Sequence, residues 1–155
     1  MPEPRKEASV LATRTPHEFT AGDMTVRYYA VTDLENDPIF KDAPEALKPV
    51  AVWVSEPDEF GELTILVSGQ MLPQVGAYAA LHEHIEFARD GRQTPCMQVE
   101  AEVLELIPPE LRLPYLEARA QMFGVLAGMS ESFAETLAWV TAQIQTLTQT
   151  NNPLN

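Results

Sequence analysis

The chain has 155 residues, 45% of them hydrophobic, which is enough to bury the core of one ordinary domain. Its 23 acidic and 10 basic side chains give a net charge of -13, and residues 33–110 carry sixteen acids against four bases. Such a field repels phosphate backbones, so we expect no direct binding of nucleic acid; it attracts cations or a basic protein partner.

Sequence features that mark membranes and secretion are not found. No apolar run reaches the roughly 18 residues of a membrane-spanning helix, so we expect no membrane segment. Arg5 and Lys6 are not followed by the apolar stretch of a secretory signal. The single cysteine, Cys96, excludes an internal disulfide framework and a cysteine-rich zinc finger, and it fits a reducing compartment. We therefore expect a cytoplasmic protein.

The first half of the chain predicts strands. Residues 1–22 contain early prolines and mixed charge, and we expect a flexible N-terminal arm there. Residues 24–31 are rich in β-branched and aromatic side chains, which predicts a strand. The apolar runs at residues 50–55 and 63–68 flank a loop of turn residues, which predicts a β-hairpin. Both runs are apolar at nearly every position, as in strands covered on both faces.

Helical patterns begin after Gly69 and Pro73. The first predicted helix covers about residues 74–89, and its apolar side chains recur at helical spacing. Residues 96–107 are ambiguous: Val99 and Val103 fit a helix, whereas the alternation of acids and apolar side chains also fits a strand. We favour the helix.

The last 45 residues predict helices alone. One covers about residues 114–127 and ends at Gly128. Ser130 or Ser132 caps the next, which continues to Thr150. The outer face of this last helix is rich in Thr and Gln with little charge, so it could also hold a homo-oligomer together.

Strands followed by helices indicate an α+β fold. We expect one domain over residues 23–150, with a small N-terminal β-sheet or hairpin followed by three to four helices. Residues 151–155 are expected to form a disordered tail.

The segment His82-Glu83-His84-Ile85-Glu86 carries the strongest chemical signal. On a helix, His82 and Glu86 are one turn apart at the border of the core face, with Glu83 beside them and His84 on the opposite flank. Two such side chains at this spacing can bind one divalent ion.

This segment resembles the active-site helix of the zincin metallopeptidases, whose pattern is His-Glu-x-x-His. His82 matches the first metal ligand and Glu83 the general base, while Glu86 stands where the second histidine would be. The resemblance, over about residues 50–107, implies a zincin-like minimal domain that binds zinc, with Glu100 or Glu102 as a third ligand. Two anionic ligands would also suit a harder ion such as manganese.

The activity that this resemblance implies is metal-dependent hydrolysis, with Glu83 taking a proton from water and passing it to the leaving amine. Tyr28, Tyr29 and Tyr115 are candidates to stabilise an oxyanion. The altered ligand also fits a catalytically degenerate relative.

Two other interpretations stay open. In the first, His82 is a core histidine that hydrogen-bonds a backbone carbonyl, and no metal binds. In the second, the chain is a non-enzymatic acidic interaction or assembly module, of a phage or mobile-element type or a DNA-mimic inhibitor. Cys96 has no histidine near it in sequence, so we expect a small buried hydrophobe rather than a nucleophile.

Overall fold

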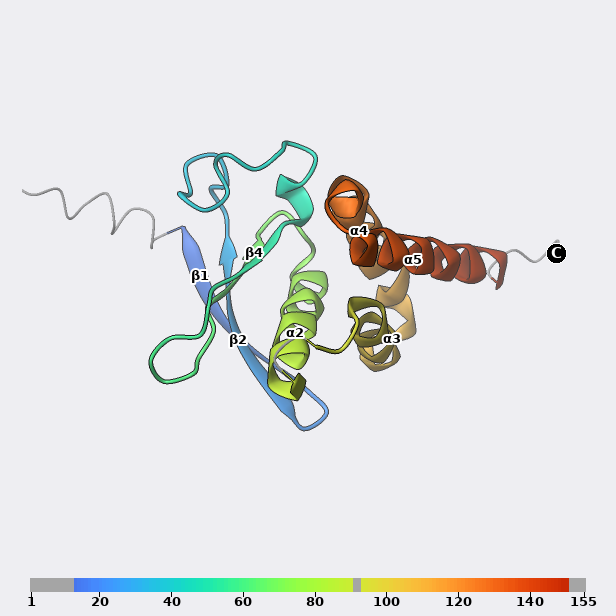
Figure 1. Cartoon of the computed structure of the whole chain (residues 1–155), viewed down its shortest axis with the longest axis horizontal. Coiled ribbons are helices and arrows are strands. Elements are labelled where there is room, and N and C mark those ends of the chain that lie inside the picture. Colours follow the sequence, from blue (N-terminus) through green and yellow to red (C-terminus); the bar gives the residue numbers. More distant parts are fainter. Residues whose placement is uncertain (1–12, 91–92, 151–155) are drawn as a thin grey trace, which may run out of the picture.

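A four-stranded sheet and four α-helices make up the α+β fold of the computed structural model, which describes residues 13–90 and 93–150 (Figure 1). The expected tail at residues 151–155 and the first twelve residues of the expected arm lie outside the described residues. Among the residues that are described, no helix has the length and apolarity needed to cross a membrane.

The sheet has the strand order β1-β2-β4-β3. Its first hairpin pairs β1 (Arg14–Ala21) with β2 (Met24–Val31) through a turn in which Gly22 adopts a φ of 61°, a conformation that favours glycine. β4 (Ile65–Ser68) is parallel to β2 and antiparallel to β3 (Val52–Val54). The predicted strand and the predicted hairpin are both confirmed, whereas β1 replaces the second part of the expected arm.

The helices are α2 (Pro73–Asp90), α3 (Cys96–Leu106), α4 (Pro109–Leu126) and α5 (Glu131–Thr150). Short 3-10 turns lie at η1 (Lys48–Val50) and η2 (Ala127–Met129). All the predicted helices are present, and the ambiguous segment is a helix. α4 begins before its predicted start: Pro109 in the first turn loses no helical hydrogen bond, and Pro114, where the helix was expected to begin, lies inside it.

β4 is buried on both faces, as its apolar sequence predicts. Ile65 and Val67 belong to the main core shared with the helices. Leu66 points the other way and packs with Val31 and Phe40, in a smaller cluster under the loop that follows β2. The sheet is therefore covered on its second face by a loop rather than by a helix.

α2 lies between the sheet and the other three helices (Figure 1). Residues 75–82 are buried at every position, since neighbours cover this part of the helix all round. His82 is the last of this run, and Glu83 after it is partly exposed. The segment with the chemical signal thus lies where α2 leaves the core.

Gly69 fixes the turn from β4 into α2. Its N–H donates a hydrogen bond to the Val31 carbonyl oxygen at 2.8 Å. A Cβ at Gly69 would lie 2.8 Å from that oxygen, so any other residue would force the two backbones apart. This close approach sets where α2 starts relative to the sheet.

Candidate metal centre

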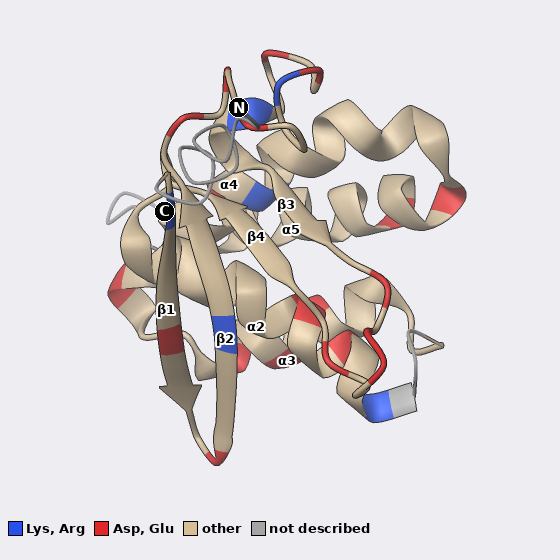
Figure 2. Cartoon of the chain, turned by 90° about the vertical axis from the view of Figure 1, so that its left-hand side faces the viewer, with Lys and Arg blue, Asp and Glu red and all other residues tan. Residues whose placement is uncertain are grey.

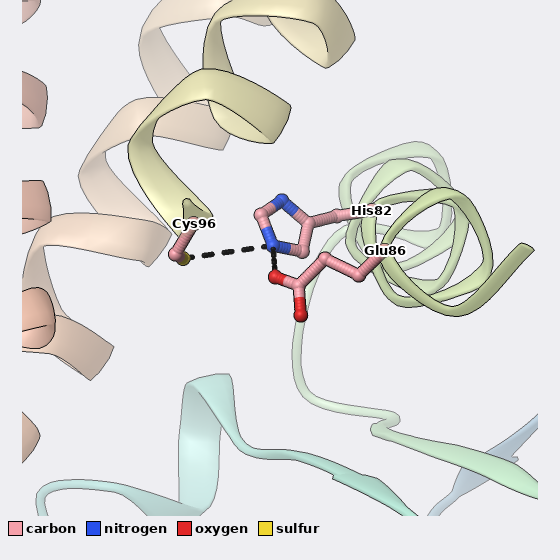
Figure 3. Close-up of side chains that lie close together, drawn as sticks. All are labelled: His82, Glu86 and Cys96. Atoms are coloured by element: carbon pink, nitrogen blue, oxygen red, sulfur yellow. Dashed lines mark hydrogen bonds and ion pairs between the residues drawn. The ribbon is translucent and has the colours of Figure 1, made fainter. Parts of the chain in front are cut away.

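His82, Glu86 and Cys96 bring their side chains together between α2 and α3 (Figure 3). His82 Nε2 contacts Glu86 Oε2, as side chains one helical turn apart can. Cys96 is the first residue of α3, and its Sγ lies 3.6 Å from the same ring nitrogen. One ligand atom from each residue lies within 4.8 Å of the other two.

Glu100 lies on the opposite side of the imidazole ring. Its Oε1 is 2.7 Å from His82 Nδ1, which is an ion-pair contact whose geometry is not that of an ordinary hydrogen bond. The Tyr115 hydroxyl donates to Glu100 Oε1, and Arg119 Nε donates to Oε2 at 2.8 Å. Both carboxylate oxygens of Glu100 therefore contact groups other than Nε2 of His82.

All four members of this network are buried: His82, Glu100, Tyr115 and Arg119 expose 2% of their surface or less. Arg119 is also held against the ring of Phe123, with its guanidinium carbon 5.0 Å from the ring centroid. Such a network fixes the plane of the imidazole and leaves Nε2 facing Glu86 and Cys96.

The charges of the network shift the protonation of its members. Burial by itself would lower the pKa of His82, but Glu100 and the hydrogen bonds to Cys96 and Glu86 raise it well above its ordinary value. Burial would raise the pKa of Glu100, yet Arg119 and His82 lower it to about 2. Burial and Glu100 raise the pKa of Tyr115, which stays a hydrogen-bond donor. A metal ion at Nε2 would have to displace the proton of His82.

A cavity of about 620 Å³ opens beside His82, Glu86 and Cys96. Glu83 lines it from α2, and its opposite wall comes from α4 and α5. Four apolar side chains share that wall: Met122, Phe123, Leu126 and Phe133. A second pocket of about 480 Å³ follows β3 and the loop after it, and it shares Val52 and Glu83 with the first.

The structure places the residues of the predicted ligand set in three different positions. His82 and Glu86 lie together, and Glu83 lines the same cavity. Glu100 contacts the ring nitrogen that faces away from Glu86. Glu102 forms an ion pair with Arg89, with Nη2 and Oε1 2.8 Å apart. Neither Glu100 nor Glu102 thus lies where a third ligand beside Nε2 would have to lie.

Cys96 occupies that place, and sequence reasoning missed it. The expected packing role rested on its distance from His82 along the chain. Its position after Pro95, at the start of a helix that returns along α2, is the signal that could have identified it. Tyr115 belongs to the buried network, while Tyr28 and Tyr29 line a separate pocket on the first hairpin.

Compared with known proteins, the chain matches no family model, no curated protein and no solved structure. The likeness to zincin metallopeptidases is therefore carried by His82, Glu83 and the position of Glu86 alone. Function has to be inferred from the chemistry of the site, because a fold by itself does not determine it.

Proposed function

We propose that the chain binds a divalent metal ion, zinc in the first place, through His82, Glu86 and Cys96, and that it is a zincin-like metal-dependent hydrolase. The observation that carries the proposal is the convergence of three ligand atoms within 4.8 Å of one another at the wall of a cavity. Imidazole, carboxylate and thiolate together suit zinc, and the thiolate favours zinc over manganese.

The surroundings of His82 support this assignment. Histidine ligands in metalloproteins commonly place the second ring nitrogen against a carboxylate, which orients the ring. Glu100 lies 2.7 Å from Nδ1 and is itself held by Arg119 and Tyr115. The ring nitrogen that remains, Nε2, is the one that faces Glu86 and Cys96.

The remaining residues of the cavity have roles that follow from their positions. A bound zinc ion lowers the pKa of a water molecule and polarises a substrate carbonyl. Glu83 follows His82 on α2 and lines the same cavity, so its carboxylate can accept a proton from water and donate it to the leaving group. The apolar wall from α4 and α5 can hold an apolar part of a substrate.

Metal content tests the proposal directly. Protein purified without chelator and without a histidine tag should contain about one equivalent of zinc, measured by elemental analysis. His82→Ala and Cys96→Ala should each lose most of this metal, because each removes one of three ligands. His84→Ala is the matched control: it lies two residues away on α2 and lines a different pocket, so it should keep the metal.

Glu83→Gln should also keep the metal, since Glu83 is not among the ligands, and circular dichroism of each variant establishes that it is folded. Absence of metal from the wild-type protein after incubation with zinc or manganese would contradict the proposal. Equal loss from His82→Ala and His84→Ala would contradict it as well.

A second candidate function, binding of a basic protein partner, is favoured by the loop between β3 and β4. Asp58 Oδ1 accepts hydrogen bonds from the backbone N–H of Phe60 at 2.8 Å and of Glu62 at 2.9 Å. The ordered loop presents Phe60 with 81% of its surface exposed, next to Glu59. Aromatic side chains are enriched at protein interfaces. This function would survive His82→Ala and would be lost on neutralising the acids of the loop.

A further inference from the structure

The cavity at the candidate metal centre is one part of a longer depression. The pocket along β3 adjoins it at Val52 and Glu83, which line both. Glu83 therefore lies near the middle, between the helices α4 and α5 at one end and the loop after β3 at the other. A depression of this form fits an extended ligand better than a compact one.

Acidic side chains line both ends of the depression. Glu135 of α5 lies at one end and Glu56 of the loop after β3 at the other. Figure 2 shows further acidic residues along that loop. Within the described residues, the basic side chains that line the two pockets are His82 and Arg119, and both are buried and paired with Glu100. A ligand therefore meets carboxylates at both ends and no free positive charge.

The wall beside Glu135 is apolar. Phe123 and Phe133 lie with their ring centroids 6.0 Å apart, and Met122 and Leu126 continue this wall along α4. A surface of this kind accepts a large aliphatic or aromatic side chain. The acidic ends, the apolar wall and the length of the two pockets therefore favour one extended ligand that carries both apolar and cationic groups.

We propose that the two adjoining pockets bind an extended polypeptide segment that places a large apolar side chain against Phe133 and basic side chains near Glu135 and Glu56. The inference rests on the proposed function, because the peptide bond that crosses Glu83 is then the one exposed to hydrolysis. Glu135 and Glu56 are specificity residues: they attract the positive charges of the segment and take no part in the chemistry.

Binding of short synthetic peptides tests the proposal without requiring catalysis. The probe is a fluorescein-labelled peptide of leucine and lysine, with matched peptides in which every lysine is replaced by glutamine or by glutamate. Fluorescence anisotropy at moderate salt gives the affinities for the full chain, with and without added zinc. We expect the lysine peptide to bind about tenfold more tightly than the glutamine peptide, and the glutamate peptide not at all.

Glu135→Gln and Glu56→Gln should each weaken binding of the lysine peptide by about threefold and leave the glutamine peptide unchanged. Glu105→Gln is the matched control, because Glu105 is an exposed acid of α3 that lines neither pocket. A loss of the same size in Glu105→Gln would show attraction by the net charge of -13 alone and would overturn the proposal. Equal affinity for the lysine and glutamine peptides would overturn it too.

The metal content of the same samples separates this inference from the proposed function. Bound zinc together with no preference for lysine would refute the inference and leave the metal site standing. A preference for lysine that depends on Glu135 and Glu56, in protein that binds no metal, would support the peptide site and refute the hydrolase.

Discussion

His82 combines a buried ring with two ring nitrogens in different surroundings. Nδ1 faces the carboxylate of Glu100, and Nε2 faces Glu86 and Cys96 at the cavity. Charged groups are costly to bury unless each has a partner, and here Arg119 supplies the opposite charge to Glu100. Removing one member would leave the others buried without compensation.

Glu100 and Glu102 are two carboxylates on the same helix with very different expected contributions to stability. Glu100→Gln should lower the free energy of unfolding by about 3 kcal/mol, because Arg119 would stay buried without its counter-charge. Glu102→Gln should lower it by less than about 1 kcal/mol, because its partner Arg89 is partly exposed. Urea denaturation of the two variants measures both values, and losses of equal size would contradict this account.

The sequence predicts the part of the site that is local and misses the part that is tertiary. His82, Glu83 and Glu86 share one side of α2 because of helical geometry, which the spacing alone predicts. Cys96 comes from the next helix and joins them only through packing. The sequence predicts Glu100 as a candidate metal ligand because it does not show which nitrogen of the His82 ring a carboxylate will face.

Among the elements, β1 was not predicted and the type of α3 was in doubt. β1 carries Pro16 and mostly exposed side chains, a pattern tolerated in an edge strand that is held by one neighbour. In α3, Val99, Glu100 and Val103 are buried, so an acid occupies a core position and disturbs the helical apolar pattern. Both departures come from tertiary contacts, which outweigh local propensity.

The start of α5 decides between two serines that the sequence left as alternatives. Ser130 Oγ accepts a hydrogen bond from the Phe133 backbone N–H at 3.1 Å, which makes Ser130 the N-cap. Ser130→Ala should therefore lower the free energy of unfolding by about 1 kcal/mol. Ser132→Ala, within the first turn of the same helix, should leave it nearly unchanged. Thermal denaturation of the two variants measures this difference. A greater loss of stability in Ser132→Ala would indicate that Ser132, and not Ser130, is the N-cap.

At the scale of the whole molecule, the two faces of the sheet are covered in different ways. α2 and the helices behind it form the main core on one face. On the other, the loop after β2 covers Leu66 and Val31. An ion pair between Arg14 and Asp37 ties that loop to the first residue of β1. The loop lacks regular secondary structure over most of its length, so this tie is important for keeping the smaller cluster closed.

Asp37 should make the stability of the whole chain depend on acidic pH. Arg14 Nε and Nη2 donate to its two oxygens at 2.9 and 3.1 Å, and the Ile39 backbone N–H donates at 2.8 Å. Burial would raise the pKa of Asp37, but Arg14 and the backbone N–H groups lower it below its ordinary value. A carboxylate with a lowered pKa in the folded state stabilises that state above its unfolded pKa, and this contribution is lost as the pH falls through the folded value.

Asp37→Asn should therefore lower the free energy of unfolding by about 2 kcal/mol at neutral pH, since Arg14 loses its buried counter-charge. The difference from wild type should shrink as the pH falls below about 4, because the unfolded chain then takes up a proton at Asp37 while the folded chain still disfavours it. Urea denaturation at neutral pH and at about pH 3 measures both values. Asp23→Asn, at an exposed acid in the turn between β1 and β2, is the control and should show no such dependence. A loss of stability in Asp37→Asn that stays constant with pH would contradict this account. It would mean that the hydrogen bonds of Asp37, and not its charge, hold the loop to the sheet.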